Sequence, residues 1–161
     1  MAAGKFTWYT SALKYIMMGR INLEPSASGK PIVAMPLHDN YTPSTASHSA
    51  LGNISAFQAT ASATIVNTIA LTGCIVTQSG VSTAKFDAAD ISGFSSDGST
   101  ITSFKWLALY AQSASNGAGV DNLLVGFMNM DTATASASAG NSTQVNITWD
   151  SSGIGKFNGN P

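Results

Sequence analysis

The sequence predicts a mostly β, single-domain protein, either a β-sandwich or a jelly-roll-like barrel, with a short N-terminal helix or arm. Three observations support this prediction. The length of 161 residues suits one compact domain. About seven or eight short stretches rich in Ile, Val, Thr and aromatic residues alternate with turn-forming residues, as in sandwiches and barrels. A helical period is found only at the start, so we divide the chain into an N-terminal segment, residues 1–30, and a β-sandwich domain, residues 31–161.

The N-terminal segment has apolar side chains at spacings of three and four, which is the period of an amphipathic helix. These side chains are Phe6, Tyr9, Leu13, Ile16, Met17 and Ile21. Gly19 weakens the last turn, and Pro25 leads into a loop. A helix of this length is marginal by itself in water, so we expect it to pack on its own subunit or on a neighbour. Residues 7–10 would also suit a strand.

The first half of the β domain begins with a short apolar run, Ile32 to Leu37, which contains Pro36 and follows a proline. Proline is confined to edges and ends of sheets, so we expect an edge strand or a strand end there. Residues 38–52 form a long polar loop, and loops of that length are usually functional or held by a partner. Residues 64–77 suggest one or two strands broken near Gly73, and the next strand ends at Asp87.

The second half contains the clearest strand, residues 100–112, whose end is apolar on both faces and therefore belongs in the centre of a sheet. Residues 123–130 are the next strand. Residues 144–149 alternate cleanly between polar and apolar side chains, residues 150–153 form a turn, and residues 154–157 close the chain. We expect these last two strands to form a hairpin.

The chain contains few charges: 9% of its residues are charged, against about 25% in an ordinary domain. A neutral Ala, Ser and Thr surface can be covered by another protein at little desolvation cost, which favours a subunit of an assembly over a free monomer. The net charge of −1, with seven Lys and Arg, gives no basic surface for nucleic acid or for anionic membranes. We expect no secretion signal either, because Lys14 interrupts the only candidate apolar core near the N-terminus.

Candidate reactive residues are few, and none forms a recognisable catalytic, cofactor or metal motif. His38 and His48 share one loop, but serines are so frequent that a Ser-His-Asp match carries no information. Asp87 and Asp90 are better suited to turn hydrogen bonds than to Ca²⁺, because apolar residues interrupt the spacing. Cys74 lies in an apolar run and is expected to be a small buried side chain. We therefore expect no enzymatic activity.

Three strand aromatics, Trp106, Tyr110 and Trp149, offer one further alternative, a sugar-binding platform. Aromatic residues at alternating strand positions belong more often to the core, and we favour that interpretation.

The order of segments resembles a known family. The segments are GRINL (residues 19–23), PIVAMPL (31–37), YTP (41–43), TAKFDAADISGFS (83–95), FKWLALY (104–110), LLVGFMNMD (123–131) and QVNITWDSSGIGKF (144–157). Each segment alone is typical of β-strands in general. Their order and spacing, however, resemble those of small β-rich virion proteins of tailed bacteriophages, the capsid decoration (cement) proteins. The chain departs from the family pattern at residues 64–73, which replace a Gly-rich stretch, and at the Ala/Ser-rich residues 132–140.

The resemblance implies a non-enzymatic protein of the virion, located on the capsid surface, with the major capsid protein and itself, as a homotrimer, for partners. We expect the contacts in the N-terminal segment and in the 38–52 loop, although the aromatics there would equally suit packing on the subunit's own sheet. The candidate contact residues are Phe6, Trp8, Tyr9, Tyr15, Met17, His38, Tyr41 and His48. A tail, baseplate or fibre-attachment protein and a carbohydrate-binding surface module remain as alternatives.

Overall fold

The computed structural model describes residues 5–25, 30–59, 68–94, 104–112, 122–130 and 145–158. Within these ranges the chain is mostly β, with antiparallel strand pairs and one short α-helix near the N-terminus. This confirms the predicted class, and the arrangement of the sheets is sandwich-like. The expected features at residues 64–67, 100–103 and 132–140 lie outside the described residues.

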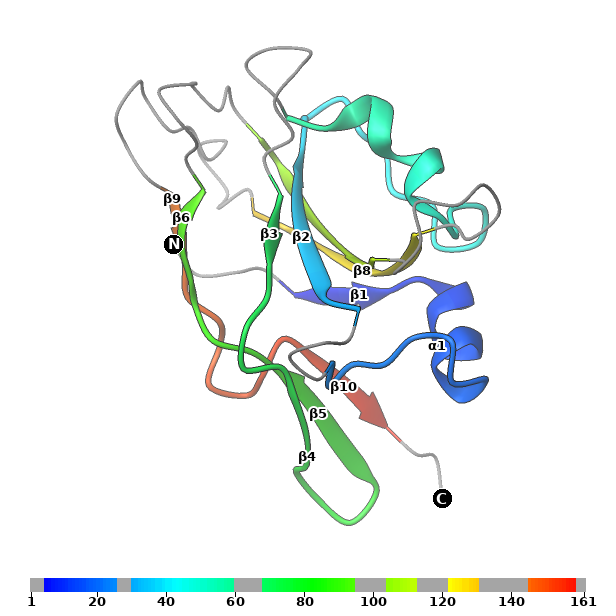
Figure 1. The fold of residues 1–161 in the computed structure, drawn as a ribbon, viewed down its shortest axis with the longest axis vertical. Coiled ribbons are helices and arrows are strands. Elements are labelled where there is room, and N and C mark those ends of the chain that lie inside the picture. Colours follow the sequence, from blue (N-terminus) through cyan, green and yellow to red (C-terminus); the bar gives the residue numbers. More distant parts are fainter. Residues whose placement is uncertain are drawn as a thin grey trace.

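The strands form three sheets. The five-stranded sheet has the order β1 (Phe6–Trp8), β8 (Leu123–Asn129), β7 (Trp106–Ala111), β2 (Ile32–Leu37) and β3 (Ile69–Ala70). The three-stranded sheet has the order β10 (Gly155–Asn158), β5 (Thr83–Asp87) and β4 (Ile75–Gln78). β6 (Ile91–Phe94) and β9 (Val145–Ile147) form a two-stranded sheet. The helix is α1 (Thr10–Met17), and two 3₁₀ turns, η1 (Leu51–Asn53) and η2 (Ser55–Phe57), follow β2. Figure 1 shows the β4–β5 hairpin projecting from one end of the molecule.

The core is centred on β2, β7 and β8. Every residue of β2 is buried, and so is every residue of β7 after Trp106. Strands buried on both faces carry continuous apolar runs in place of alternation. The central position predicted for the strand at residues 100–112 is confirmed, since β7 lies between β8 and β2.

The expectation for Ile32 to Leu37 was an edge strand or a strand end. The edge strand is wrong, because β2 has β7 on one side and β3 on the other, whereas the strand end holds, because Pro31 precedes β2 and Pro36 is its next-to-last residue. Proline is tolerated there for a geometric reason. The Ile32 carbonyl accepts a hydrogen bond from Leu71 and the Pro36 carbonyl accepts one from Ala59, both on the side away from β7. The N–H that Pro36 lacks would point to that same side, so the β2–β7 ladder loses no bond.

The N-terminal segment is built into the body of the molecule. β1 pairs with β8, with Thr7 opposite Phe127, and the helix begins only at Thr10. The predicted helix from residue 6 is therefore too long, and the strand alternative holds for residues 6–8. Tyr9 and Ala12 are completely buried, so residues 6–17 pack as part of the same unit as the strands that follow. Edge pairing and aromatic burial outweigh the helical period of the first apolar residues.

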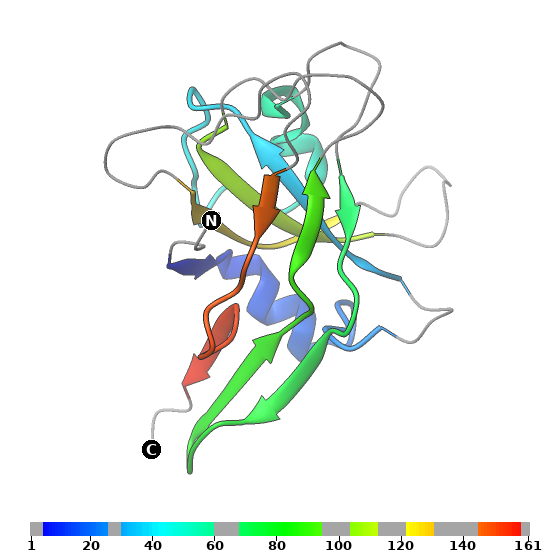
Figure 2. The same cartoon turned by 90° about the vertical axis from the view of Figure 1, so that its left-hand side faces the viewer.

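The predicted C-terminal hairpin is wrong. The strands on either side of the turn at residues 150–153 do not pair with each other: β9 pairs with β6, and β10 pairs with β5. Figure 2 shows this C-terminal stretch running alongside β5 and β6. Between the two pairs, the Trp149 backbone N–H donates to Asp90 Oδ1 at 2.9 Å, and Ile154 donates to the Phe86 carbonyl at 2.8 Å. The alternation of residues 144–149 predicts which side chains share a face, but it does not specify the partner strand.

Two predicted boundaries are confirmed. The chain breaks between β3 and β4 at Gly73, whose φ of 62° is in the region that favours glycine. β5 ends at Asp87, as expected.

Candidate functional site

The eight candidate contact residues divide into three groups. Tyr9 and Tyr41 are core residues, with 0% and 2% of their surface exposed. They are therefore not surface contacts in this structure, and their rings serve internal packing, which was the alternative use expected of the aromatics. Met17 is 88% exposed. The other five are half-buried: Phe6, Trp8, Tyr15, His38 and His48.

Three exposed apolar side chains, Leu13, Met17 and Met18, form what we call the α1 apolar face. Leu13 is 42% and Met18 is 59% exposed, and Ala12 is the only buried residue of the helix. Leu13 and Met17 are four residues apart on α1 and therefore lie on the same side of the helix. Exposed apolar groups that lie together mark surfaces for contact with other molecules. Lys14 is exposed on the same helix. Of the eight candidate contact residues, only Met17 belongs to the α1 apolar face.

The 38–52 loop is tied to the body by a chain of hydrogen bonds rather than left free. The hydroxyl oxygens of Tyr9 and Tyr41 lie 2.8 Å apart, and Tyr41 Oη lies 2.9 Å from His48 Nδ1. Burial raises the pKa of both tyrosines, so their hydroxyls stay protonated and act as hydrogen-bonding groups. The Thr10 backbone N–H donates to the Thr45 carbonyl and so fixes the loop to the start of α1. The sequence predicts only a polar loop around His48. In the structure, His48 holds that loop to the body of the molecule through Tyr41.

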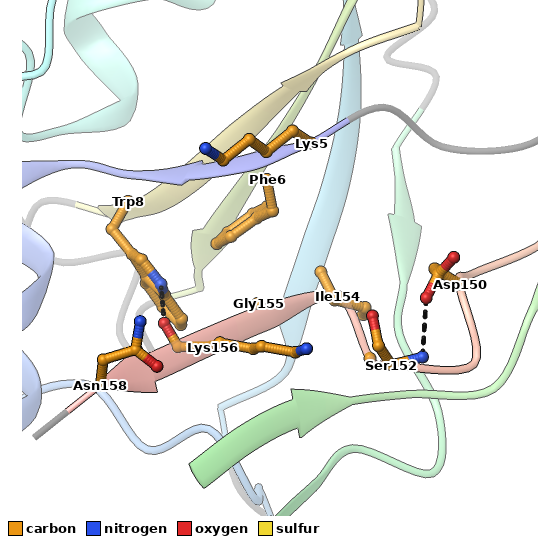
Figure 3. A pocket seen from close by; sticks show the side chains of 10 residues that line it. Lys5, Phe6, Trp8, Asp150, Ser152, Ile154, Gly155, Lys156 and Asn158 are labelled. Atoms are coloured by element: carbon orange, nitrogen blue, oxygen red, sulfur yellow. Dashed lines mark hydrogen bonds between the residues drawn. The ribbon is translucent and has the colours of Figure 1, made fainter. Parts of the chain in front are cut away.

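A cleft of about 440 Å³ lies between β1 and the C-terminal stretch (Figure 3). Its lining residues are Lys5, Phe6, Trp8, Asp150, Ser152, Gly153, Ile154, Gly155, Lys156 and Asn158. The Trp8 indole Nε1–H donates to the Lys156 carbonyl at 3.1 Å, and this bond joins the two walls. The Trp8 ring lies 4.3 Å from Phe157 and meets Phe6 edge-on at 4.9 Å, measured between ring centroids. The cleft thus combines aromatic rings, a hydroxyl, an amide and charged groups, as small-molecule sites do.

Sequence reasoning missed this cleft. Phe6 and Trp8 are among the predicted contact residues, but their partners lie more than 140 positions away in the sequence. The turn that brings these partners near belongs to the predicted hairpin, which does not form. Within the cleft, hydrogen bonds from Ser152 lower the pKa of Asp150, and the nearby Lys156 lowers it further. Asp150 is therefore a carboxylate at neutral pH.

The other acidic residues singled out in the sequence hold the backbone. Asp87 forms an ion pair with Lys85 at 3.3 Å and accepts a hydrogen bond from the Ala88 N–H. Asp90 Oδ1 accepts a hydrogen bond from the Trp149 backbone N–H, 59 positions away in the sequence. In the described part of the chain, no group of three or more His, Cys, Asp or Glu side chains is placed to hold a metal ion. Cys74 is only half-buried, and burial raises the pKa of its thiol.

The strand aromatics do not form a platform for sugars. Tyr110 is 5% and Trp149 is 7% exposed, and the Trp149 indole donates to the Ala89 carbonyl. Trp106 is half-buried, packs edge-on against Phe127 at 5.7 Å and lies under Lys105. These positions agree with the core interpretation of Tyr110 and Trp149.

No protein-family model matches the chain, and neither the curated proteins nor the solved structures contain a significant match. Across the residues that the structure describes, no helix is both long and apolar enough to span a membrane.

Proposed function

We propose that this chain is a bacteriophage capsid decoration (cement) protein, a non-enzymatic component of the virion. It binds the outer surface of the expanded head and stabilises contacts between major capsid proteins. The observation that carries the proposal is the ordered series of segments from residue 19 to residue 157, which resembles that of the phage virion family. The mostly β fold is compatible with that resemblance, although fold alone does not establish function.

Two physical properties support a role in an assembly. Only 9% of the residues are charged, so another protein can cover the surface while few ions leave water. The α1 apolar face exposes Leu13 and Met17 on α1 and Met18 at the C-cap of the helix. Covering such side chains is favourable by about 25 cal/mol for each Å² of apolar surface removed from water. We therefore place the capsid contact at this face.

The proposed mechanism is mechanical. A protein that binds only the expanded shell stabilises that state by mass action. Modest affinity for each subunit is sufficient, because a symmetric trimer engaging neighbouring capsid proteins gains from multivalency. Homotrimer formation and location on the capsid surface belong to the same proposal.

The first test is the copy number in purified virions, measured by gel densitometry against the major capsid protein. A decoration protein is expected at about one copy per capsid protein, or one trimer per local threefold axis. A ratio below a few per cent would instead favour the alternative of a tail, baseplate or fibre-attachment protein. Absence from the virion would refute both assignments.

A matched pair of variants tests the contact surface. Met17→Lys introduces a charge into the α1 apolar face, whereas Val81→Lys changes a fully exposed apolar residue in the turn between β4 and β5. Both proteins are added to heads purified from a phage that lacks the gene, and bound protein is measured after sedimentation. We expect Met17→Lys to lower binding about tenfold or more and Val81→Lys to bind normally. Equal binding by the two variants would remove the α1 apolar face from the proposal.

The remaining alternative is a carbohydrate-binding surface module, and the burial of Tyr110 and Trp149 argues against a binding platform made of Trp106, Tyr110 and Trp149. Two of these three rings are buried in the core.

A further inference from the structure

The cleft between β1 and the C-terminal stretch has properties that capsid attachment does not use. Its two walls come from opposite ends of the chain, with Lys5, Phe6 and Trp8 on one side and residues 150–158 on the other. Figure 3 shows the rings of Phe6 and Trp8 on the β1 side, and the Lys156 side chain extending along β10 toward the 150–153 turn. The lining from the C-terminal stretch includes two residues without side chains, Gly153 and Gly155, and Gly155 lies directly against the rings of Phe6 and Trp8.

The aromatic wall is held in place. A Cβ atom at Gly155 would lie 2.8 Å from both the Phe6 and the Trp8 rings, so only glycine allows β10 to approach them this closely. The Trp8 indole is further fixed by its bond to the Lys156 carbonyl and by its contact with Phe157. Fixed rings lose little conformational entropy when a ligand stacks on them.

The cleft also concentrates charge in a chain that contains little of it. The whole sequence has 15 charged residues, 7 basic and 8 acidic, and three of them line this one cleft. Lys5, Lys156 and Asp150 give it a net charge of one positive unit. The Ser152 hydroxyl and the Asn158 amide add groups that both donate and accept hydrogen bonds.

We propose that this cleft binds a sugar unit that carries a carboxylate, such as a uronic acid residue of an acidic polysaccharide. The C–H face of the pyranose ring packs against the aromatic wall, and its hydroxyls bond to Asp150, Ser152 and Asn158. The Lys156 ammonium group donates a charge-assisted hydrogen bond to the carboxylate of the sugar and neutralises its charge. An extended peptide fits less well, because the Lys156 carbonyl that would pair with an added strand already accepts from Trp8. This inference does not depend on the proposed function.

The test uses the full chain labelled with ¹⁵N and methyl β-D-glucuronide as the probe. The three tryptophans give three indole N–H signals from different surroundings: the cleft for Trp8, a half-buried position beside Phe127 for Trp106, and a bond to Ala89 for Trp149. We expect a saturable shift of the Trp8 signal while the other two stay in place. Two further probes, methyl β-D-glucoside and acetate, carry the ring alone and the carboxylate alone, and both are expected to bind at least about tenfold more weakly.

A pair of lysine variants completes the test. Lys156→Met keeps the backbone carbonyl that Trp8 uses and removes only the exposed charge, so the fold is retained. Lys105→Met is the matched control, because Lys105 also lies near a tryptophan, 5.9 Å from the Trp106 ring, but outside the cleft. We expect Lys156→Met to weaken glucuronide binding about tenfold, to the level of the glucoside, and Lys105→Met to leave it unchanged. Absence of a saturable Trp8 shift, equal binding of acetate and glucuronide, or an equal effect of the two variants would each overturn the proposal.

Discussion

The five-stranded sheet and the three-stranded sheet are built from similar strand sequences, yet they bury very different parts of them. β2, β7 and β8 are buried almost throughout. In the three-stranded sheet, β4 has no buried residue, and β5 has one, Phe86. Figure 1 shows the β4–β5 hairpin projecting away from the body that contains the five-stranded sheet. Apolar side chains of similar type therefore form the core in one region and a surface in the other.

This difference indicates which region supplies most of the stability and which regions are accessible for binding. Burial of apolar surface is the main source of stability, so the five-stranded sheet determines whether the chain folds. The smaller sheet depends on the body through a few contacts near β1, including Trp8 with Phe157 and Phe6 with Gly155. The exposed groups and the cleft that we assign to binding lie outside the buried strands β2, β7 and β8, at α1 and at the junction between the edge strand β1 and β10. Stability and recognition are thus separable by mutation.

The largest expected effect comes from a cavity in the five-stranded sheet. Leu109, in the centre of β7, is completely buried. Leu109→Ala should lower the free energy of unfolding by about 2–5 kcal/mol, measured by urea denaturation. Ile75→Ala in β4, where the side chain is 47% exposed, should cost less than about 1 kcal/mol. Equal losses would show that the two sheets contribute alike and would invalidate the comparison.

The next effect is expected at the junction of β1 with the body. A Cβ atom at Gly126 would lie 2.7 Å from the Thr7 carbonyl oxygen and would also meet the Phe6 ring. Gly126→Ala should therefore destabilise the protein by about 1–3 kcal/mol, because β1 must shift. The control is Gly52→Ala, where a Cβ would meet nothing within 4 Å, and its effect should stay within about 0.5 kcal/mol. If Gly126→Ala matches this control, β1 is held more loosely than the close packing indicates.

A third prediction concerns alkaline pH. Burial raises the pKa of Tyr9 and Tyr41 in the folded chain, whereas a tyrosine in the unfolded chain has a pKa of about 10. Above that pH the folded state binds more protons than the unfolded state, so stability must fall as the pH rises, by up to about 1.4 kcal/mol per pH unit for each tyrosine. Below it, the tyrosines contribute no pH dependence.

Thermal unfolding between about pH 8 and pH 11 checks this prediction. Tyr9→Phe should make the alkaline decline shallower, while at neutral pH it loses about 1 kcal/mol with the hydrogen bond to Tyr41. Gly126→Ala serves as the control, since it should lower stability at every pH without changing the slope. An unchanged slope in Tyr9→Phe would mean that Tyr9 does not cause the decline.

The smallest effect is expected at the outer edge of the three-stranded sheet. The Glu24 carboxylate accepts a hydrogen bond from the Val76 N–H at 2.6 Å, which occupies an exposed donor on β4. Glu24→Ala should cost less than about 1 kcal/mol, because the site is exposed to water. It should also raise light scattering on heating, since the freed donor can pair with another chain. Glu24→Gln retains an acceptor oxygen and should behave like the natural protein.

The accuracy of the sequence predictions follows the same division between the two regions. The mostly β class, the central strand at residues 100–112 and the break at Gly73 follow from local pattern and turn chemistry. Strand partners depend on contacts between distant residues, and the predictions of a C-terminal hairpin and of an edge position for β2 were therefore wrong. The candidate contact residues stay a prediction. The sequence does not tell which of them are accessible: Met17 is exposed, whereas Tyr9 and Tyr41 pair in the core.

The sequence by itself determined that the surface carries few charges and that the strands are short and apolar, because composition and local periodicity do not depend on which distant residues meet. Only the tertiary structure decided that β9 and β10 separate to join β6 and β5, and that Trp8 meets Lys156 across a cleft. Period-two alternation orients side chains without naming a partner, so the choice is made by long-range packing. The close approach of Gly126 and Gly155 to the Phe6 ring illustrates that choice, since it exists only once both ends of the chain have folded together.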